Sequence, residues 1–199
     1  MAKLRAMVQK TRKVYIHNDL SGATSHIKQT IEAKLDRKDR RGIAFDYMAC
    51  AVMLAFSFEA NLNFVGYKLF QKDWNERARW GDKVNRVFQH LKIPQDRAAR
   101  PYSSVVRLKS VRDLLAHGKP VESEHEEIVE ATADDLDRGI DLSGEWEKAC
   151  AHDSVFEAFD DVESLWRDML QRADISHFDT LTRGNGGITV LETLEESAT

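Results

Sequence analysis

An arginine, an aspartate and a histidine occur within six consecutive residues near the middle of the chain. They are Arg112, Asp113 and His117, in the segment RDLLAHG that ends at Gly118. An imidazole can take a proton from an RNA 2′-hydroxyl or give one to the leaving 5′-oxygen. A guanidinium can bind two phosphate oxygens and stabilise the negative charge that develops on them. The pattern therefore predicts RNA cleavage that leaves a 2′,3′-cyclic phosphate and needs no metal or cofactor.

On a helix, these side chains point in two directions. Successive residues turn by about 100°, so Asp113 and His117 share a face and Asp113 can accept a hydrogen bond from His117. Arg112 lies about 140° from His117 around the same helix. The two can meet one phosphate only if the arginine wraps across, or if a second copy of the chain supplies the missing group. The second option predicts a homodimer with its site between the subunits. Simple capping of the helix end by His117 is the plainer interpretation.

The elements that must hold these residues are helical, because the chain has only three prolines and few turn clusters. Apolar periodicity predicts helices over residues 24–36, 43–70, 83–91, 101–117 and 154–173. The fourth of these ends at Gly118, with Pro120 beyond it. The first half of the long second helix is apolar on nearly every side, so it lies at the centre of a bundle or at a subunit interface.

We therefore expect an all-α fold, a bundle of four to six helices over residues 24–181 with an acidic C-terminal extension. A basic segment, residues 1–23, precedes it, and a tail, residues 182–199, follows it. The tail begins with a glycine turn and continues into a strand-like run at residues 188–191, which predicts a small β element or a mobile end. Residues 127–132 fit either a short strand or a loose helix.

Charge is distributed unevenly along the chain. Residues 1–120 contain 24 Lys/Arg and 11 Asp/Glu, a balance of +13, whereas residues 121–199 contain 5 and 22, a balance of −17; together they give the net −4. A basic first part suits a polyanionic ligand such as RNA. The acidic part is either an ordinary solvated surface or a competitor that occludes the basic surface.

Three features bear on the compartment and on membrane association. Cys50 and Cys150 lie a hundred residues apart without metal-ligand spacing, which favours a reducing cytoplasm over a disulfide scaffold. The N-terminal residues lack the apolar core of a secretory signal. The apolar run over residues 42–58 contains Asp46 and is shorter than the roughly 20 residues that a membrane span needs. We interpret it as a buried helix and expect no membrane association.

The motif and its surroundings resemble the HEPN domain family. HEPN signatures place an arginine, usually a polar residue, and then a histidine near the end of a late core helix, as Arg112, Asp113 and His117 would be here. An earlier core helix in that family often carries a glutamate and an asparagine, and the segment SFEANLN, with Glu59 and Asn63, is similar. The resemblance covers about residues 42–120, and the helix near residues 154–173 would complete the bundle.

The resemblance implies an α-helical bundle, a homodimer with a composite cleft and, in many members, a metal-independent ribonuclease. Such members act in toxin–antitoxin, phage-defence or RNA-processing systems, so a separate antitoxin or other partner protein is implied. Others have lost activity and serve as binding modules for a protein or a nucleotide. Arg112 and His117 favour activity, whereas Asp113 stands where asparagine is common in the family.

Other candidate residues have competing structural interpretations. Glu59 and Asn63 share a helix face at i and i+4, where they border the cleft or form an internal polar pair. Trp74 and Trp80, with basic neighbours, could stack on RNA bases, although core packing is the simpler interpretation. His125 lies in an acidic run that could bind a metal, although a solvated loop is the simpler interpretation. We therefore predict no metal site.

Overall fold

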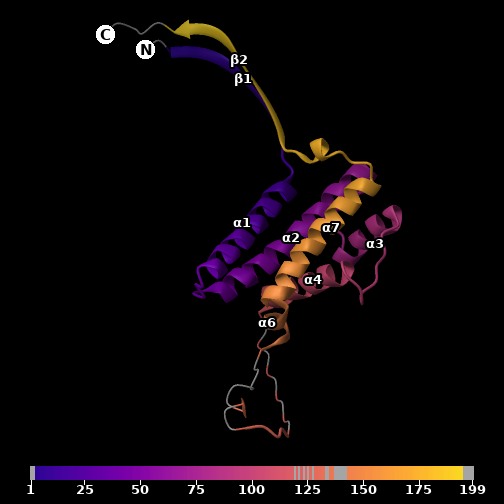
Figure 1. Ribbon diagram of the computed structural model, residues 1–199. Helices are drawn as coiled ribbons and strands as arrows, with labels where there is room; N and C mark the ends of the chain where they lie inside the picture. Colours follow the sequence, from indigo (N-terminus) through magenta and orange to yellow (C-terminus); the bar gives the residue numbers. More distant parts are fainter. Residues whose placement is uncertain are drawn as a thin grey trace.

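The computed structural model describes residues 3–118 and 143–194, together with 120, 122, 124, 126, 128–132 and 135–136 of the segment between. Among these residues it contains six α-helices, two 3₁₀ helices and two strands. In chain order these are β1 (Lys3–Lys13), α1 (Ile16–Asp36), α2 (Ile43–Phe70), η1 (Gln71–Asp73), α3 (Trp80–Leu91), α4 (Tyr102–His117), α6 (Glu145–Ala149), α7 (His152–Arg172), η2 (His177–Thr180) and β2 (Arg183–Leu194). The predicted helical bundle is confirmed at this level (Figure 1).

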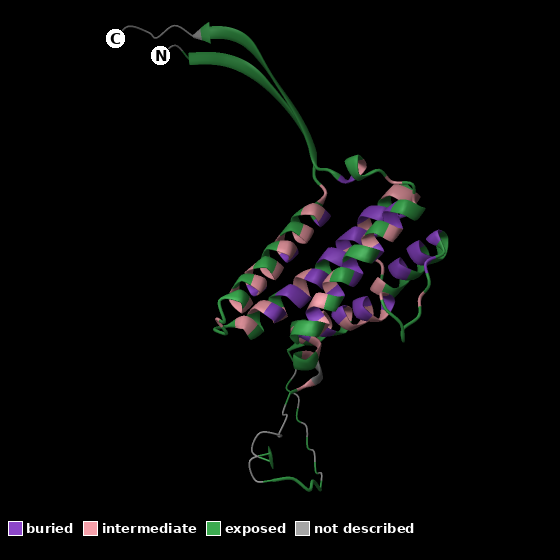
Figure 2. Cartoon of the chain, in the orientation of Figure 1, coloured by how far each residue is buried: buried purple, intermediate pink, exposed green. Residues whose placement is uncertain are grey.

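Helix α2 is the centre of the bundle, as its apolar sequence predicts. It packs against α1, α3, α4 and α7, and its buried residues include Cys50, Leu54, Phe58, Leu62 and Val65. Figure 2 shows the buried residues gathered where α2, α3, α4 and α7 face one another. By length and composition alone, Ile43–Asp73 could cross a membrane. The packing of other helices around α2 is nevertheless compatible with a soluble protein.

Three large aromatic side chains of α2 are exposed to solvent. Phe45, Phe56 and Tyr67 are 72%, 41% and 50% exposed, and their spacing in the sequence puts them on one stripe of the helix. Phe56 and Tyr67 also line a cavity beside α2. Exposed aromatic side chains are available for contact with another molecule.

Helix α1 begins at Ile16, eight residues before the predicted start at Thr24. Its buried face includes His17 and Thr24 as well as Ile31, so polar residues occupy positions where an apolar periodicity search finds no signal. The Thr24 hydroxyl is satisfied inside the helix, because it donates to the Leu20 carbonyl oxygen over 2.8 Å. The basic N-terminal segment therefore belongs partly to the bundle.

The two ends of the chain pair with each other. β1 and β2 form a two-stranded antiparallel sheet that runs from Lys3 opposite Leu194 to Lys13 opposite Arg183. In Figure 1 this ribbon leaves the bundle and projects away from it. The predicted strand-like run in the tail is thus part of a longer strand, whereas β1 was not predicted. Residues 128–132, which fit strand or helix equally, adopt neither.

Candidate active site

Helix α4 packs against the core with one face and presents the motif along its edge. Val105, Leu108 and Val111 are buried, which leaves Arg112 and Asp113 partly buried and His117 exposed. The helix ends as predicted, because Gly118 adopts the left-handed conformation with φ 54°. Its N–H donates to the Leu114 carbonyl oxygen over 3.1 Å. This cap places His117 on the last turn of a well-defined helix.

Arg112 contacts a glutamate that lies 53 residues earlier in the chain. Its Nη1 donates to Glu59 Oε2 over 2.5 Å, and its Nη2 donates to Asp113 Oδ1 over 2.8 Å. The side chain of Arg112 is 20% exposed. A guanidinium at the edge of an apolar stripe requires a partner or a ligand, and Glu59 from α2 is such a partner.

The other oxygen of Glu59 binds a buried lysine. Lys83, on the first turn of α3, donates from Nζ to Glu59 Oε1 over 2.5 Å and to the Glu76 carbonyl oxygen over 3.1 Å. The Lys83 side chain is only 2% exposed. Asp113 in turn binds a second lysine, since Lys109 Nζ lies 2.5 Å from Asp113 Oδ2. We call these five connected residues the ion-pair network: Lys83, Glu59, Arg112, Asp113 and Lys109. With three cations and two carboxylates it carries one net positive charge.

These contacts determine the ionisation of the network. Burial by itself would raise the pKa of Glu59, but hydrogen bonds and positive charge from Lys83 and Arg112 outweigh it and lower that pKa. For Asp113, burial is likewise outweighed by Lys109 and Arg112, so its pKa is also lowered. Burial would lower the pKa of Arg112, but Asp113 and Glu59 raise it. Glu59, Asp113 and Arg112 are therefore ionised at neutral pH.

The structure corrects the predicted role of Asp113. Its carboxylate binds Lys109 and Arg112, and no hydrogen bond from His117 to Asp113 occurs in the described part of the chain. A lysine at i−4 and the adjacent guanidinium offer full positive charges, which bind a carboxylate more strongly than a neutral imidazole does. Asp113 thus orients Arg112 rather than His117.

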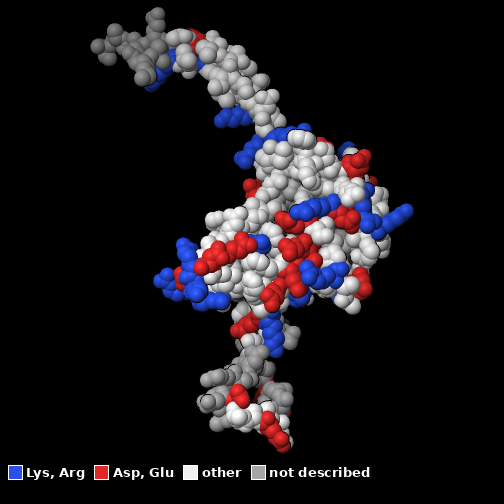
Figure 3. All heavy atoms as spheres, in the orientation of Figure 1, with Lys and Arg blue, Asp and Glu red and all other residues white. Residues whose placement is uncertain are grey.

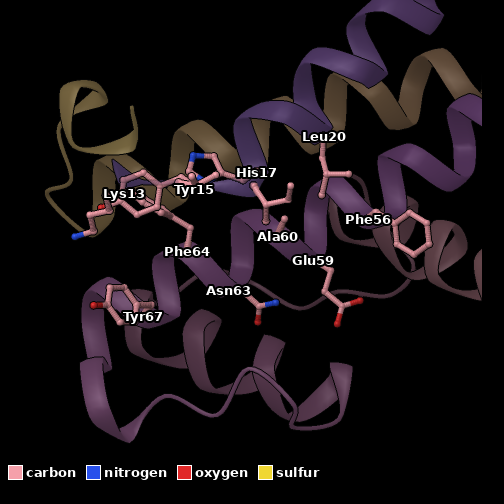
Figure 4. Close-up of a pocket in the computed structure, with 12 residues that line it drawn as sticks. Lys13, Tyr15, His17, Leu20, Phe56, Glu59, Ala60, Asn63, Phe64 and Tyr67 are labelled. Carbon is pink, nitrogen blue, oxygen red and sulfur yellow. The ribbon is translucent and has the colours of Figure 1, made fainter. Parts of the chain in front are cut away.

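Glu59 and Asn63 also line a cavity of about 520 Å³ beside α2. Figure 4 shows both side chains projecting from α2 on one side, with Phe56 at one end of the row and Tyr67 at the other. Residues 13–17 and Leu20 form the opposite wall. Aromatic rings and an amide along one cavity are groups that bind a flat polar molecule such as a nucleobase. Glu59 belongs both to this cavity and to the ion-pair network.

His17 forms part of the cavity wall and is itself buried. Its side chain packs among three aromatic rings, with centroid distances of 5.8 Å to Tyr15, 4.4 Å to Phe64 and 5.1 Å to Trp166. His17 Nε2 and Asn63 Oδ1 are buried without a hydrogen-bond partner among the described residues. Burial lowers the pKa of His17 from 6.5 to about 4, so the imidazole is neutral at physiological pH.

The buried His17 makes acid destabilise the fold. As the pH falls from 6.5 to about 4, the unfolded chain protonates this histidine while the folded chain does not. The contribution of the neutral His17 to the free energy of unfolding is fully present above pH 6.5 and is lost as the pH falls. At about 1.4 kcal/mol per pH unit, the total loss is about 3 kcal/mol. We expect His17→Phe to remove this part of the pH dependence, measured by urea unfolding at several pH values. The control His26→Phe, which replaces an exposed histidine, should leave the dependence of the unfolding free energy on pH unchanged. The same dependence in His17→Phe as in the wild type would contradict the expectation.

Sequence reasoning missed Lys83 and His17. Lys83 was detectable, because it lies four and eight residues before Val87 and Leu91, on the apolar face of α3. A lysine there needs a buried carboxylate. His17 gave no such signal in the sequence, because the cavity that it lines is formed together with residues of α2 that are distant in the chain.

Of the remaining candidate residues, two pack in the core and one lies outside the residues that the structure describes. Trp74 is 8% exposed and packs so closely over Gly66 that a Cβ there would lie 2.5 Å from the indole ring. Trp80 packs against Phe58 with a centroid distance of 6.1 Å. Both tryptophans therefore serve the core, the simpler of their two interpretations. His125 lies outside the described residues.

No protein-family model, curated protein or solved structure matches the chain. The chemistry open to the site is therefore inferred from its own residues.

Proposed function

We propose that the chain is a HEPN-like, metal-independent endoribonuclease that cleaves RNA by attack of the 2′-hydroxyl in the cleft of a homodimer. In this proposal it acts in the cytoplasm, as a toxin or defence effector with a separate antitoxin or other partner protein. Arg112 binds the scissile phosphate, and His117 transfers the proton. Asp113 and Glu59 hold the guanidinium of Arg112, and Asn63 borders the cleft.

The observation that carries the proposal is the contact between Arg112 and Glu59. Two segments that the sequence marks separately, the arginine–histidine motif and the SFEANLN segment, meet through this 2.5 Å hydrogen bond. Arg112 is thereby fixed beside a cavity that is large enough for a nucleotide. A structural ion pair alone would not require aromatic and amide side chains next to it.

The proposed division of labour follows from charge and exposure. Arg112 is only 20% exposed and held by two carboxylates, which fix the orientation of its planar group. Its Nε and Nη2 donate to Asp113 and its Nη1 to Glu59, so a phosphate would bind the remaining N–H groups of Nη1 and Nη2. The network retains one positive charge, which attracts a phosphate. His117 is exposed at the end of α4, where an imidazole is accessible to the 2′-hydroxyl or to the leaving oxygen of a bound strand.

A second subunit enters the proposal because Arg112 and His117 lie about 140° apart around α4. Arg112 is turned toward α2, and no hydrogen bond joins it to His117 in the described part of the structure. A second copy would bring its own His117 to the first copy's Arg112. The exposed aromatic side chains Phe45, Phe56 and Tyr67 offer a surface on which such a copy could pack.

The proposal is tested by incubating the purified full-length chain with labelled RNA and with DNA of the same sequence, both in EDTA. We expect RNA fragments that end in 2′,3′-cyclic phosphate and no cleavage of DNA, because DNA lacks the attacking hydroxyl. Replacing the 2′-hydroxyl at the cleavage position by 2′-O-methyl should block the reaction. Cleavage of that modified RNA, or no cleavage of any RNA offered, would contradict the proposal.

A second candidate is a non-catalytic HEPN-like helical module that dimerises or binds a protein or nucleotide. The observation in its favour is that Arg112 already has carboxylate partners, Glu59 and Asp113, as a purely structural cation does. This module would bind RNA or a nucleotide in the same cavity without turnover. Binding that leaves the RNA intact in the assay above would support it over the ribonuclease.

A further inference from the structure

The two-stranded ribbon of β1 and β2 is exposed to solvent at every residue whose burial the structure describes. Every described side chain of Lys3–Lys13 and of residues 183–193 lies in the exposed class, and Figure 2 shows the ribbon without a buried residue. Two strands alone are marginally stable in water, because neither face of the pair is covered. An element of this kind is stabilised by whatever it binds, so the composition of the ribbon indicates its ligand.

The ribbon is strongly basic. It contains six Lys/Arg against a single acidic residue, Glu192. Basic side chains recur along it and near its junction with the bundle in Figure 3. Two of the cations have ion-pair partners: Arg5 Nη1 lies 3.8 Å from Glu192 Oε2, and Arg183 Nη2 lies 3.2 Å from Asp179 Oδ1. Lys10 and Arg12, by contrast, have no ion-pair partner among the described residues.

Glycines lie directly opposite these two free cations. Lys10 pairs with Gly186, and Arg12 pairs with Gly184. Cross-strand partners and alternate residues share one face of a ladder, so the four residues form one side of the ribbon. It is a strip of bare backbone bordered by two cations about 7 Å apart along the strand.

The fold itself does not require these glycines. Neither has a positive φ, and a Cβ at either position would meet only a backbone oxygen at 3.6 Å, an ordinary contact. Glycine weakens a strand, because it loses more backbone entropy on folding and contributes no side chain. A glycine that the strand does not need marks a place where another molecule approaches the backbone closely.

We propose that this face of the ribbon, formed by Lys10, Arg12, Gly184 and Gly186, binds the sugar–phosphate backbone of a nucleic acid strand. Lys10 and Arg12 contact two phosphates, and the glycines let the strand lie against the ribbon. That the strand is the RNA substrate rests on the proposed function. The contact itself does not depend on catalysis, because the ribbon is separate from the ion-pair network.

The charge argument is tested with the double variant Lys10→Gln/Arg12→Gln in the full-length chain. Fluorescence anisotropy measures binding of a labelled RNA oligonucleotide in EDTA at several salt concentrations, in a His117→Ala background that prevents cleavage. Two lost phosphate contacts should lower the salt slope by about 1.4 and the affinity by roughly 10- to 30-fold at 0.1 M salt. The control Lys72→Gln/Arg77→Gln, with the same change in charge on exposed bundle residues, should change affinity by less than about twofold. Equal effects of the two pairs would overturn the proposal.

The glycine argument has an independent test, Gly184→Thr/Gly186→Thr. Threonine favours strands, so the amides of the ribbon should exchange hydrogen more slowly while RNA affinity falls by about tenfold or more. Because the charge is unchanged, a fall in affinity here identifies close approach rather than electrostatics. Unchanged affinity in a stabilised ribbon would overturn the proposal. Duplex RNA and single-stranded DNA serve as parallel ligands and identify the kind of strand that is bound.

The two proposals can fail separately. RNA that binds through Lys10 and Arg12 without being cleaved by the wild-type chain would support the ribbon and contradict the ribonuclease. RNA that the wild-type chain cleaves, and that both ribbon variants bind as tightly as the wild type does, would support the ribonuclease and contradict the ribbon proposal. Concentration-dependent self-association that is lost when Val8 and Ile188 are replaced by threonine, with RNA binding unaffected by the glycine and charge variants, would assign the ribbon to contact between copies instead.

Discussion

Replacing His117 by alanine is expected to lower the rate of RNA cleavage by about 10²- to 10⁴-fold, the usual contribution of a positioned general acid–base. The imidazole is exposed on the last turn of α4, so its removal should change the free energy of unfolding by less than about 1 kcal/mol. Loss of activity without loss of stability is therefore expected. Initial rates in EDTA and urea unfolding curves on the same preparations measure the two quantities.

The matched control is His26→Ala, which removes another exposed histidine, on α1. It should leave both the cleavage rate and the stability unchanged. Cleavage that survives in His117→Ala at the wild-type rate would remove His117 from the mechanism and favour the non-catalytic module.

A mixing experiment with the same variant tests the composite cleft. His117→Ala and Arg112→Ala should each be inactive alone. If each site takes Arg112 from one copy and His117 from the other, random exchange of subunits gives half heterodimers, each with one intact site. The mixture should then recover about a quarter of the wild-type activity. No recovery, with subunit exchange confirmed by mass, would mean that both groups act from the same chain.

Replacing Glu59 by glutamine should lower the free energy of unfolding by about 3 kcal/mol or more, because a buried cation loses its partner. Lys83 is 2% exposed, so its ammonium cannot regain water when the carboxylate is removed. Arg112 would lose its contact with α2 at the same time. Urea unfolding at neutral pH measures the change, and an effect below about 1 kcal/mol would contradict the importance of the network.

Two controls separate this network from ordinary surface charge. Adding Lys83→Met to Glu59→Gln removes the unpaired cation and should recover part of the lost stability. If the two substitutions acted independently, their losses of unfolding free energy would simply add. Glu32→Gln breaks a more exposed pair with Lys28 and should cost less than about 0.5 kcal/mol.

The pH dependence of Glu59 has a definite sign. Lys83 and Arg112 hold the pKa of Glu59 below its ordinary value of 4.5 despite the opposing effect of burial. Its contribution to stability is therefore fully present above pH 4.5 and is lost as the pH falls through the lowered pKa. Glu59→Gln should abolish that acid-dependent loss and leave the loss between pH 6.5 and about 4 that belongs to His17.

Much of the helical structure follows from local sequence. The predicted bounds of α2 agree with the structure, and the glycine stop after His117 is where α4 ends. Both features depend on interactions within a few residues, namely apolar periodicity and the left-handed conformation that glycine adopts readily. The sequence also marked Arg112 and His117 by residue type and spacing, and Glu59 through the resemblance of its segment to HEPN domains.

The relations between those residues depended on tertiary structure. Whether Arg112 meets Glu59, and whether Asp113 turns toward His117 or toward Lys109, is decided by which charges the packed helices bring within hydrogen-bonding distance. The pairing of β1 with β2 likewise joins the two ends of the chain, and no local pattern in Lys3–Lys13 specifies a partner that lies about 180 residues away. The sequence by itself determined most of the helices and the candidate groups. Only the packing of distant segments decided the ion-pair network, the buried neutral His17 and the basic ribbon, because each depends on neighbours that are remote in the chain.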